Sequence, residues 1–93
     1  MFSGAESLDQ PLNFTSTKNV ENMADMFSGA SSFNQPLNFN TENVNNMNCM
    51  FFHSHSFNQS INSWDVNNVS KFDNIFDNCP ISEENKPVFR ILI

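Results

Sequence analysis

The sequence predicts an α/β fold of about three stacked coils, with a short parallel sheet on one side and short helices on the other. Three observations predict this class. The chain repeats itself at a nearly constant spacing, one stretch of each copy has the apolar spacing of a helix, and another alternates apolar and polar residues as a strand does. A constant spacing of this length is typical of arrays in which each copy packs only on its neighbours.

The copies occupy residues 1–25, 26–49 and 50–74, and a partial fourth copy covers residues 75–81. The first copy opens with MFSGAESLDQPLNF, the second with MFSGASSFNQPLNF and the third with MFFHSHSFNQSINS. We therefore predict a repeat solenoid over residues 1–81. Residues 82–93 are predicted to form a C-terminal capping tail.

Each copy holds a predicted helix of about nine or ten residues, which is too short to be stable without packing. Its apolar columns are Val20, Val44 and Val69; Met23, Met47 and Phe72; Met26, Met50 and Ile75; and Phe27, Phe51 and Phe76. Their steps of three, three and one place them on one helical face. The predicted N-caps are Asn19, Asn43 and Asn68. The predicted helix stops, at residues that tolerate positive φ, are Gly4, Gly29, His53 and Asn78.

The predicted strand lies in the middle of each copy, where apolar residues alternate with polar ones. The segments are Leu12-Asn13-Phe14, Leu37-Asn38-Phe39 and Ile61-Asn62-Ser63-Trp64-Asp65-Val66. This alternation is typical of a short, half-buried strand. One strand per copy, repeated along a stack, predicts a parallel sheet.

Amide side chains also form columns, and two interpretations of them remain open. The columns are Gln10, Gln35 and Gln59; Asn13, Asn38 and Asn62; and Asn19, Asn43 and Asn68. Stacked amides can satisfy backbone groups from coil to coil. Alternatively, they can form a polar recognition face or a cation site. Because Asp9 is followed by Asn34 and Asn58, the carboxylates form no column, which disfavours a calcium site.

Charge and composition exclude several function classes. The formal net charge is −6 with four Lys and Arg residues, which argues against nucleic-acid binding and against anionic membrane surfaces. No apolar run is long enough for membrane insertion, and no signal-peptide pattern is present. His53 and His55 lack further ligands at metal-binding spacing, and Cys79 in a core column indicates a buried thiol. We predict no cofactor, no metal and no enzyme activity.

The segments MFSGASSFNQPLN, NSWDVNNVSK and NVENMADMF closely resemble the repeat of BspA-like leucine-rich-repeat surface proteins. Similar repeats occur in mycoplasma lipoproteins and in arrays from algae and giant viruses. The resemblance covers Met1 to about Ile81. It implies a leucine-rich-repeat-like solenoid, a cell-surface or secreted location, and no catalytic residues. The chain departs from the pattern in having about three copies, no export signal or lipid-anchor Cys, and a third copy without Gly and Pro.

From these observations we expect a non-catalytic module for protein interaction or surface adhesion, with an unknown protein or glycan partner. The candidate partner face consists of Asn13, Asn38, Asn62 and Asp65. The alternative is a purely structural spacer or an assembly subunit, such as a component of a viral particle.

The two ends of the array are expected to differ. The apolar residues of the segment 87–93 predict a cap over the last coil. The first strand, around Leu12, has no comparable cover and would present an open edge. We therefore expect the N-terminal coil to be covered by self-association or by a longer parent protein.

Overall fold

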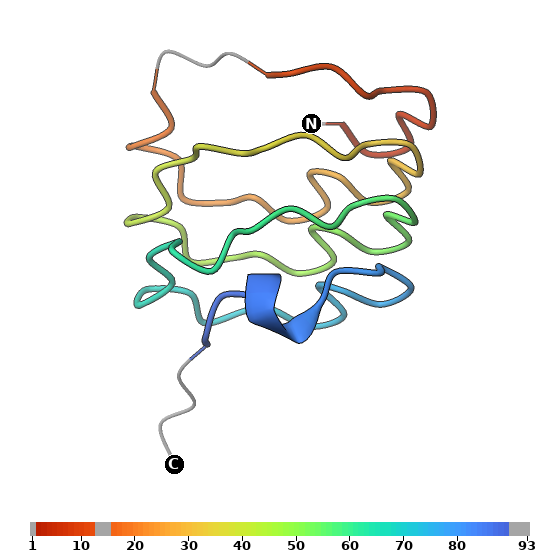
Figure 1. The fold of residues 1–93 in the computed structure, drawn as a ribbon. Coiled ribbons are helices and arrows are strands. Elements are labelled where there is room, and N and C mark those ends of the chain that lie inside the picture. The colour runs from red at the N-terminus through yellow and green to blue at the C-terminus, as the bar shows by residue number, and fades with distance from the viewer. Residues whose placement is uncertain (1, 13–15, 90–93) are drawn as a thin grey trace.

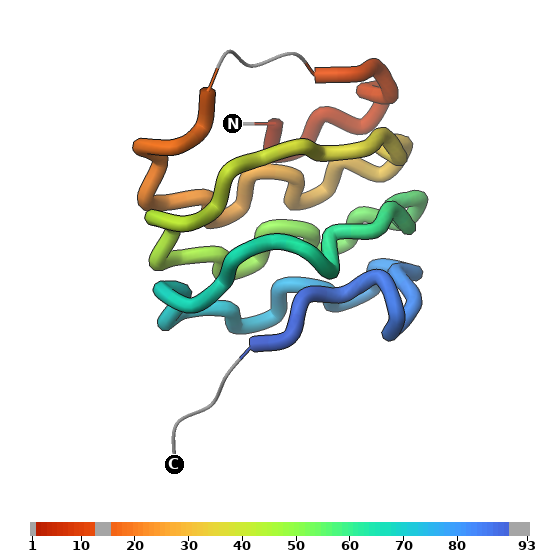
Figure 2. Tube along the Cα trace, turned by 60° about the vertical axis from the view of Figure 1, so that its left-hand side comes forward, coloured from red at the N-terminus to blue at the C-terminus, as the bar shows by residue number. Residues whose placement is uncertain are grey.

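The chain winds through a stack of coils, each made of about one copy of the repeat (Figure 1). The computed structural model describes residues 2–12 and 16–89. The first coil lies at one end of the stack and the last at the other, and the second view shows the same order (Figure 2). The principal extents are 38 × 29 × 21 Å.

The predicted α/β class is wrong. Within residues 2–12 and 16–89 there is no helix of seven or more residues and no sheet. The regular element there is a single 3-10 turn, η1 (Glu83–Asn85). Two isolated parallel bridges, Asn22 to Asn46 and Asn46 to Lys71, link successive coils. The described chain is a compact globule with almost no regular secondary structure, built around a buried aromatic cluster.

The predicted helices are absent because their backbone N–H groups serve two different partners. In the segment 23–30, which spans the boundary between the first and second copies, alternate N–H groups donate to the next coil: Met23 to Asn46, Asp25 to Asn48, Phe27 to Met50 and Gly29 to Phe52, at 2.7–2.9 Å. The N–H groups between them donate three residues back: Met26 to Met23, Ser28 to Asp25 and Ala30 to Phe27. An α-helix would direct every N–H to the carbonyl four residues back. Here half of them hold the coils together instead.

Left-handed residues interrupt the same segment in each copy. Asp25, Cys49 and Asn74 have φ values of 59°, 56° and 55°, in the middle of the predicted helices. A right-handed helix excludes this conformation. The column predicted to tolerate positive φ does adopt it. Its values are 74° at Gly4, 73° at Gly29, and 57° at both His53 and Asn78.

The predicted strands are also absent from the described residues, and the segment around Asn13 lies outside them. Around Trp64 the chain turns instead of extending, since its N–H donates to the Ile61 carbonyl three residues back. The Asp65 carboxylate then accepts the N–H of Asn67, two residues on. Such side-chain turns compete with a strand ladder.

The core is a ladder of Phe rings that runs through the stack. Phe27 stacks on Phe2 and on Phe51 at 5.5 Å between ring centroids, and Phe51 stacks on Phe76 at 5.8 Å. A second row pairs Phe33 with Phe57 at 6.1 Å. The equivalent residues of successive copies therefore lie on top of each other, as the repeat spacing predicts.

Candidate polar binding groove

The described residues of the predicted partner face do not line the polar groove described below. Asn13 lies outside the described residues, while Asn38, Asn62 and Asp65 are exposed. The Asn62 amide donates to the Glu84 carbonyl at 3.1 Å, and the Asp65 carboxylate accepts the Asn67 N–H at 3.0 Å. Two of the predicted residues thus already support the local fold.

One polar ladder crosses every coil interface. The N–H of Asn34 donates to Asp9 Oδ1 at 3.0 Å, that of Asn58 to Asn34 Oδ1 at 2.9 Å, and that of Ser82 to Asn58 Oδ1 at 3.0 Å. Gln35 and Gln59 donate their amides to the same oxygens of the preceding coil, at 2.9 and 3.0 Å. The Gln amides therefore link successive coils, but they donate to the column of Asp9 and Asn34 and not to one another, as stacking of identical amides would require.

Asp9 is the charged member of this ladder. The side-chain hydrogen bond from Gln35, followed by the backbone N–H of Asn34, lowers the pKa of its carboxyl below the ordinary value of 3.8. Both hydrogen bonds stabilise the ionised form of the Asp9 carboxyl. Asp9 therefore acts as an oxygen acceptor like Asn34 and Asn58, and the column supplies no cluster of carboxylates for a cation.

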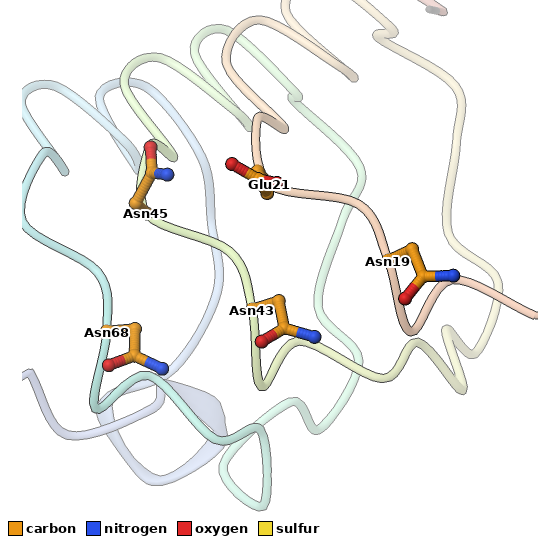
Figure 3. A pocket seen from close by; sticks show the side chains of 5 residues that line it. All are labelled: Asn19, Glu21, Asn43, Asn45 and Asn68. Atoms are coloured by element: carbon orange, nitrogen blue, oxygen red, sulfur yellow. The ribbon is translucent and has the colours of Figure 1, made fainter.

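A second amide ladder lies at one corner of the coils. Asn43 Nδ2 donates to the Lys18 carbonyl and Asn68 Nδ2 to the Glu42 carbonyl, both at 2.7 Å. These residues were predicted to cap helices. That prediction is wrong because no helix follows them, and their side chains reach the preceding coil instead. In Figure 3 the amides of Asn19, Asn43 and Asn68 point the same way.

Beside this ladder lies an open groove of about 610 Å³ (Figure 3). Its lining consists of Asn19, Glu21, Asn43, Asn45 and Asn68. Among the described residues, neither the Glu21 carboxylate nor the Asn45 amide has a hydrogen-bond partner. The groove thus offers amide oxygens and one carboxylate, with no cationic side chain in its lining. This set suits a ligand rich in hydrogen-bond donors, and a positive charge on it would be favoured.

Sequence reasoning found the Asn column of the groove but missed Glu21 and Asn45. Both occupy one column, two residues after Asn19 and Asn43, and the third copy has Ser70 there. The signal was a column that stays polar in every copy without repeating one residue. A column that is polar in every copy but does not repeat one residue type indicates exposed side chains, not a hydrogen-bonded ladder between coils.

The described His and Cys residues do not contribute to a metal-binding cluster. In the part of the chain that the structure describes, no three His, Cys, Asp or Glu side chains are placed to hold a metal ion. His53 Nε2 lies 2.9 Å from the Asn78 amide nitrogen. Cys49 and Cys79 are free thiols. Desolvation is the main cause that raises the pKa of both, and nearby carboxylates add to it at Cys49.

No helix among residues 2–12 and 16–89 has the length and apolar character needed to cross a bilayer.

Comparisons with curated proteins and with solved structures return no match. A family model described as "Mycoplasma protein of unknown function, DUF285" matches residues 1–88. This range includes both ladders and all five groove residues. The chain therefore belongs to the DUF285 family of Mycoplasma proteins of unknown function.

Proposed function

We propose that this protein is a non-catalytic binding module that takes a basic segment of a protein partner into the polar groove. The observation behind the proposal is the pairing state of the groove residues. Asn43 and Asn68 direct their donors to the preceding coil, which leaves their oxygens for a ligand. The Glu21 carboxylate and the Asn45 amide face the same groove and have no partner among the described residues.

Charge supports a basic partner. The chain carries ten acidic and four basic residues, and Glu21 is the acidic residue in the groove lining. A surface with this balance attracts cationic partners and accelerates their encounter. Lys and Arg side chains present several N–H donors each, which matches a lining of amide and carboxylate oxygens.

The resemblance of the repeat to BspA-like leucine-rich-repeat surface proteins supports a role outside enzyme chemistry. In this proposal the resemblance suggests the biological role, which is surface display or adhesion. The groove is the surface that contacts the partner. The polar columns recur along the stack instead of converging on one reacting atom, which also favours binding over catalysis.

The test compares two charge-reversing variants against a panel of immobilised Lys- and Arg-rich peptides. Glu21→Lys places a cation inside the groove. Glu6→Lys changes the net charge equally at an exposed position outside the groove lining. We expect Glu21→Lys to weaken binding about tenfold or more, and Glu6→Lys to have a much smaller effect. Equal losses in both variants would show general charge attraction and contradict a groove-specific contact.

A structural spacer is the second candidate, and a specific observation favours it. Most of the repeated amides already bond within the stack, including Gln35, Gln59, Asn43 and Asn68. In that case the amide columns hold the coils at a fixed separation and no ligand is required. Binding unchanged by both groove and control variants would support this role.

A further inference from the structure

The acidic residue of the polar groove lies at one end of it. The lining residues come from successive coils: Asn19 and Glu21 from the first, Asn43 and Asn45 from the second, and Asn68 from the third (Figure 3). Lys18 and Glu42 precede lining residues in the chain, but neither of them lines the groove. A cationic side chain of a partner is therefore favoured beside Glu21, and an uncharged donor is favoured beside Asn68.

Backbone hydrogen bonds fix the distance between the two ends of the groove. The Asn45 N–H donates to the Glu21 carbonyl at 2.8 Å, and the Ser70 N–H donates to the Asn45 carbonyl at 2.9 Å. Three successive coils are therefore hydrogen-bonded to one another at this surface. Chains paired in this way lie about 4.8 Å apart. A partner that contacts both the first and the third coil must span about 9.6 Å, which is twice that spacing.

The amide oxygens in the groove are held in a fixed orientation. Asn43 Nδ2 donates to the Lys18 carbonyl and Asn68 Nδ2 to the Glu42 carbonyl, both at 2.7 Å. Each of these bonds uses the nitrogen of the amide and leaves its oxygen to accept a hydrogen bond from a partner. Side chains that are already held in place lose little conformational freedom when a ligand binds.

The span of about 9.6 Å can be compared with three regular conformations of a bound peptide segment. A β-strand repeats on one face about every 6.6 Å, so neither one repeat nor two repeats match the span. A polyproline II segment places residues i and i+3 on one face, about 9.3 Å apart. An α-helix places residues i and i+7 about 10.5 Å apart, but its backbone N–H groups are used within the helix. The N–H groups of a polyproline II segment stay free to donate to the oxygens of the groove.

We propose that the groove binds an extended segment in the polyproline II conformation. Lys or Arg at position i pairs with Glu21, and a side-chain donor such as Gln at position i+3 donates to Asn68. The segment lies along the stack and crosses the second coil between these two contacts. The inference rests on the proposed function, and it adds the conformation of the basic segment and the spacing of its contact residues.

The experiment uses three peptides of identical composition, each with one Lys and one Gln in a host rich in Pro and Ser. Gln follows Lys by two, three or four residues. An NMR titration of the isotope-labelled wild-type chain measures the three dissociation constants. We expect the spacing of three to bind about fivefold more tightly than the other two, because it adds one hydrogen bond to the ion pair. Equal affinities, or tightest binding at another spacing, overturn the inference.

A double-mutant cycle assigns the Gln contact to the third coil. Replacing the Gln of the spacing-three peptide by Ala should weaken its binding to the wild-type chain about fivefold, and should have no such effect on Asn68→Ala. Gln59→Ala is the matched control, since it removes a ladder amide of the same copy outside the groove. It should preserve the fivefold effect. A fivefold effect that persists in a folded Asn68→Ala chain contradicts the contact, and the spacing series needs no variant at all.

Glu21→Lys separates this inference from the proposed function. If this variant weakens binding of all three peptides while the wild-type chain does not distinguish their spacings, the groove binds basic segments without selecting a conformation. The proposed function then stands and the inference falls. If no peptide binds the wild-type chain, or Glu21→Lys leaves binding unchanged, both fall.

Discussion

Val20 and Val44 are the same residue in the same column of successive copies, yet their surroundings differ completely. Val44 is fully buried, whereas Val20 is 36 % exposed. The segment around Val44 has coils on both sides, and its backbone carbonyls and N–H groups bond in both directions. The segment around Val20 has a coil on one side among the described residues. In this fold, burial depends on the number of neighbouring coils more than on the residue type.

Among the substitutions that test this comparison, the largest loss of stability is expected in the centre of the aromatic ladder. Phe51 is fully buried and contacts Phe27, Phe57 and Phe76 at 5.5, 4.3 and 5.8 Å between centroids. Phe51→Ala should lower the free energy of unfolding by about 3–5 kcal/mol, because it leaves a cavity with rings on several sides. Urea denaturation followed by Trp64 fluorescence measures it. The same change at the half-buried Phe2 should have a smaller effect, and an equal loss would contradict the comparison.

The valine pair itself provides the second test. Val44→Ala removes two buried methyl groups and should cost about 2 kcal/mol of unfolding free energy. Val20→Ala changes a partly exposed side chain and should cost less than about 0.5 kcal/mol. Both values come from the same denaturation experiment at a concentration where the chain is monomeric. Similar losses at the two positions would mean that the first coil is covered in solution.

A smaller effect concerns the left-handed column, where two copies have Gly and the third has His53. Because His53 adopts a φ of 57°, His53→Gly should raise the unfolding free energy by about 0.5–1 kcal/mol. Gly29→Ala should lower it by about 1–2 kcal/mol. A Cβ at Gly29 would meet Gly4 at an ordinary 3.6 Å, so the cost there arises from the backbone conformation. Thermal unfolding of both variants measures the two signs, and a loss at both positions would refute the strain argument.

The smallest expected effect appears at low pH. The folded pKa of Asp9 is lowered by Gln35 and Asn34, so its contribution to stability is full above the unfolded pKa, near 3.8. It is lost as the pH falls through the folded pKa, because the protonated carboxyl is a weaker acceptor. Asp9→Asn places in the first coil the residue that the ladder has at Asn34 and Asn58. The thermal unfolding midpoint of Asp9→Asn should therefore fall less than that of the wild type as the pH is lowered from about 5 to about 2. A hydrogen-bonded carboxylate loses its contribution to stability over about this pH range. Parallel pH profiles would exclude this role for Asp9.

The helix prediction shows where sequence patterns mislead in a stacked fold. The steps between Val20, Met23, Met26 and Phe27 fit one face of a helix. They fit equally well a series of tight turns in which about every third side chain points into the core. A helix this short gains little from its own hydrogen bonds. Here alternate N–H groups find acceptors on the next coil instead. The left-handed column of Asp25, Cys49 and Asn74 was the available signal, since Asp and Asn tolerate this conformation better than most residues.

The candidate site was predicted in part. The amide columns were visible because Gln35, Gln59, Asn43 and Asn68 repeat, and the structure shows each donating to the preceding coil. The groove was not visible. Its position depends on how the chain turns at the corner of each coil, near Asn19, Asn43 and Asn68. That turn is set by backbone hydrogen bonds, which a pattern of residue types does not specify.

The sequence by itself determined which residues meet. Copies of nearly equal length must superpose equivalent positions when they stack, so the Phe column and the amide ladders follow directly from the spacing. Only the tertiary structure decided the backbone conformation and the exposure of the ends. Each N–H group can bond within its own turn or to a neighbouring coil, and the choice depends on whether that coil is present. The same dependence leaves Val20 exposed at one end of the stack while Val44 is buried in its middle.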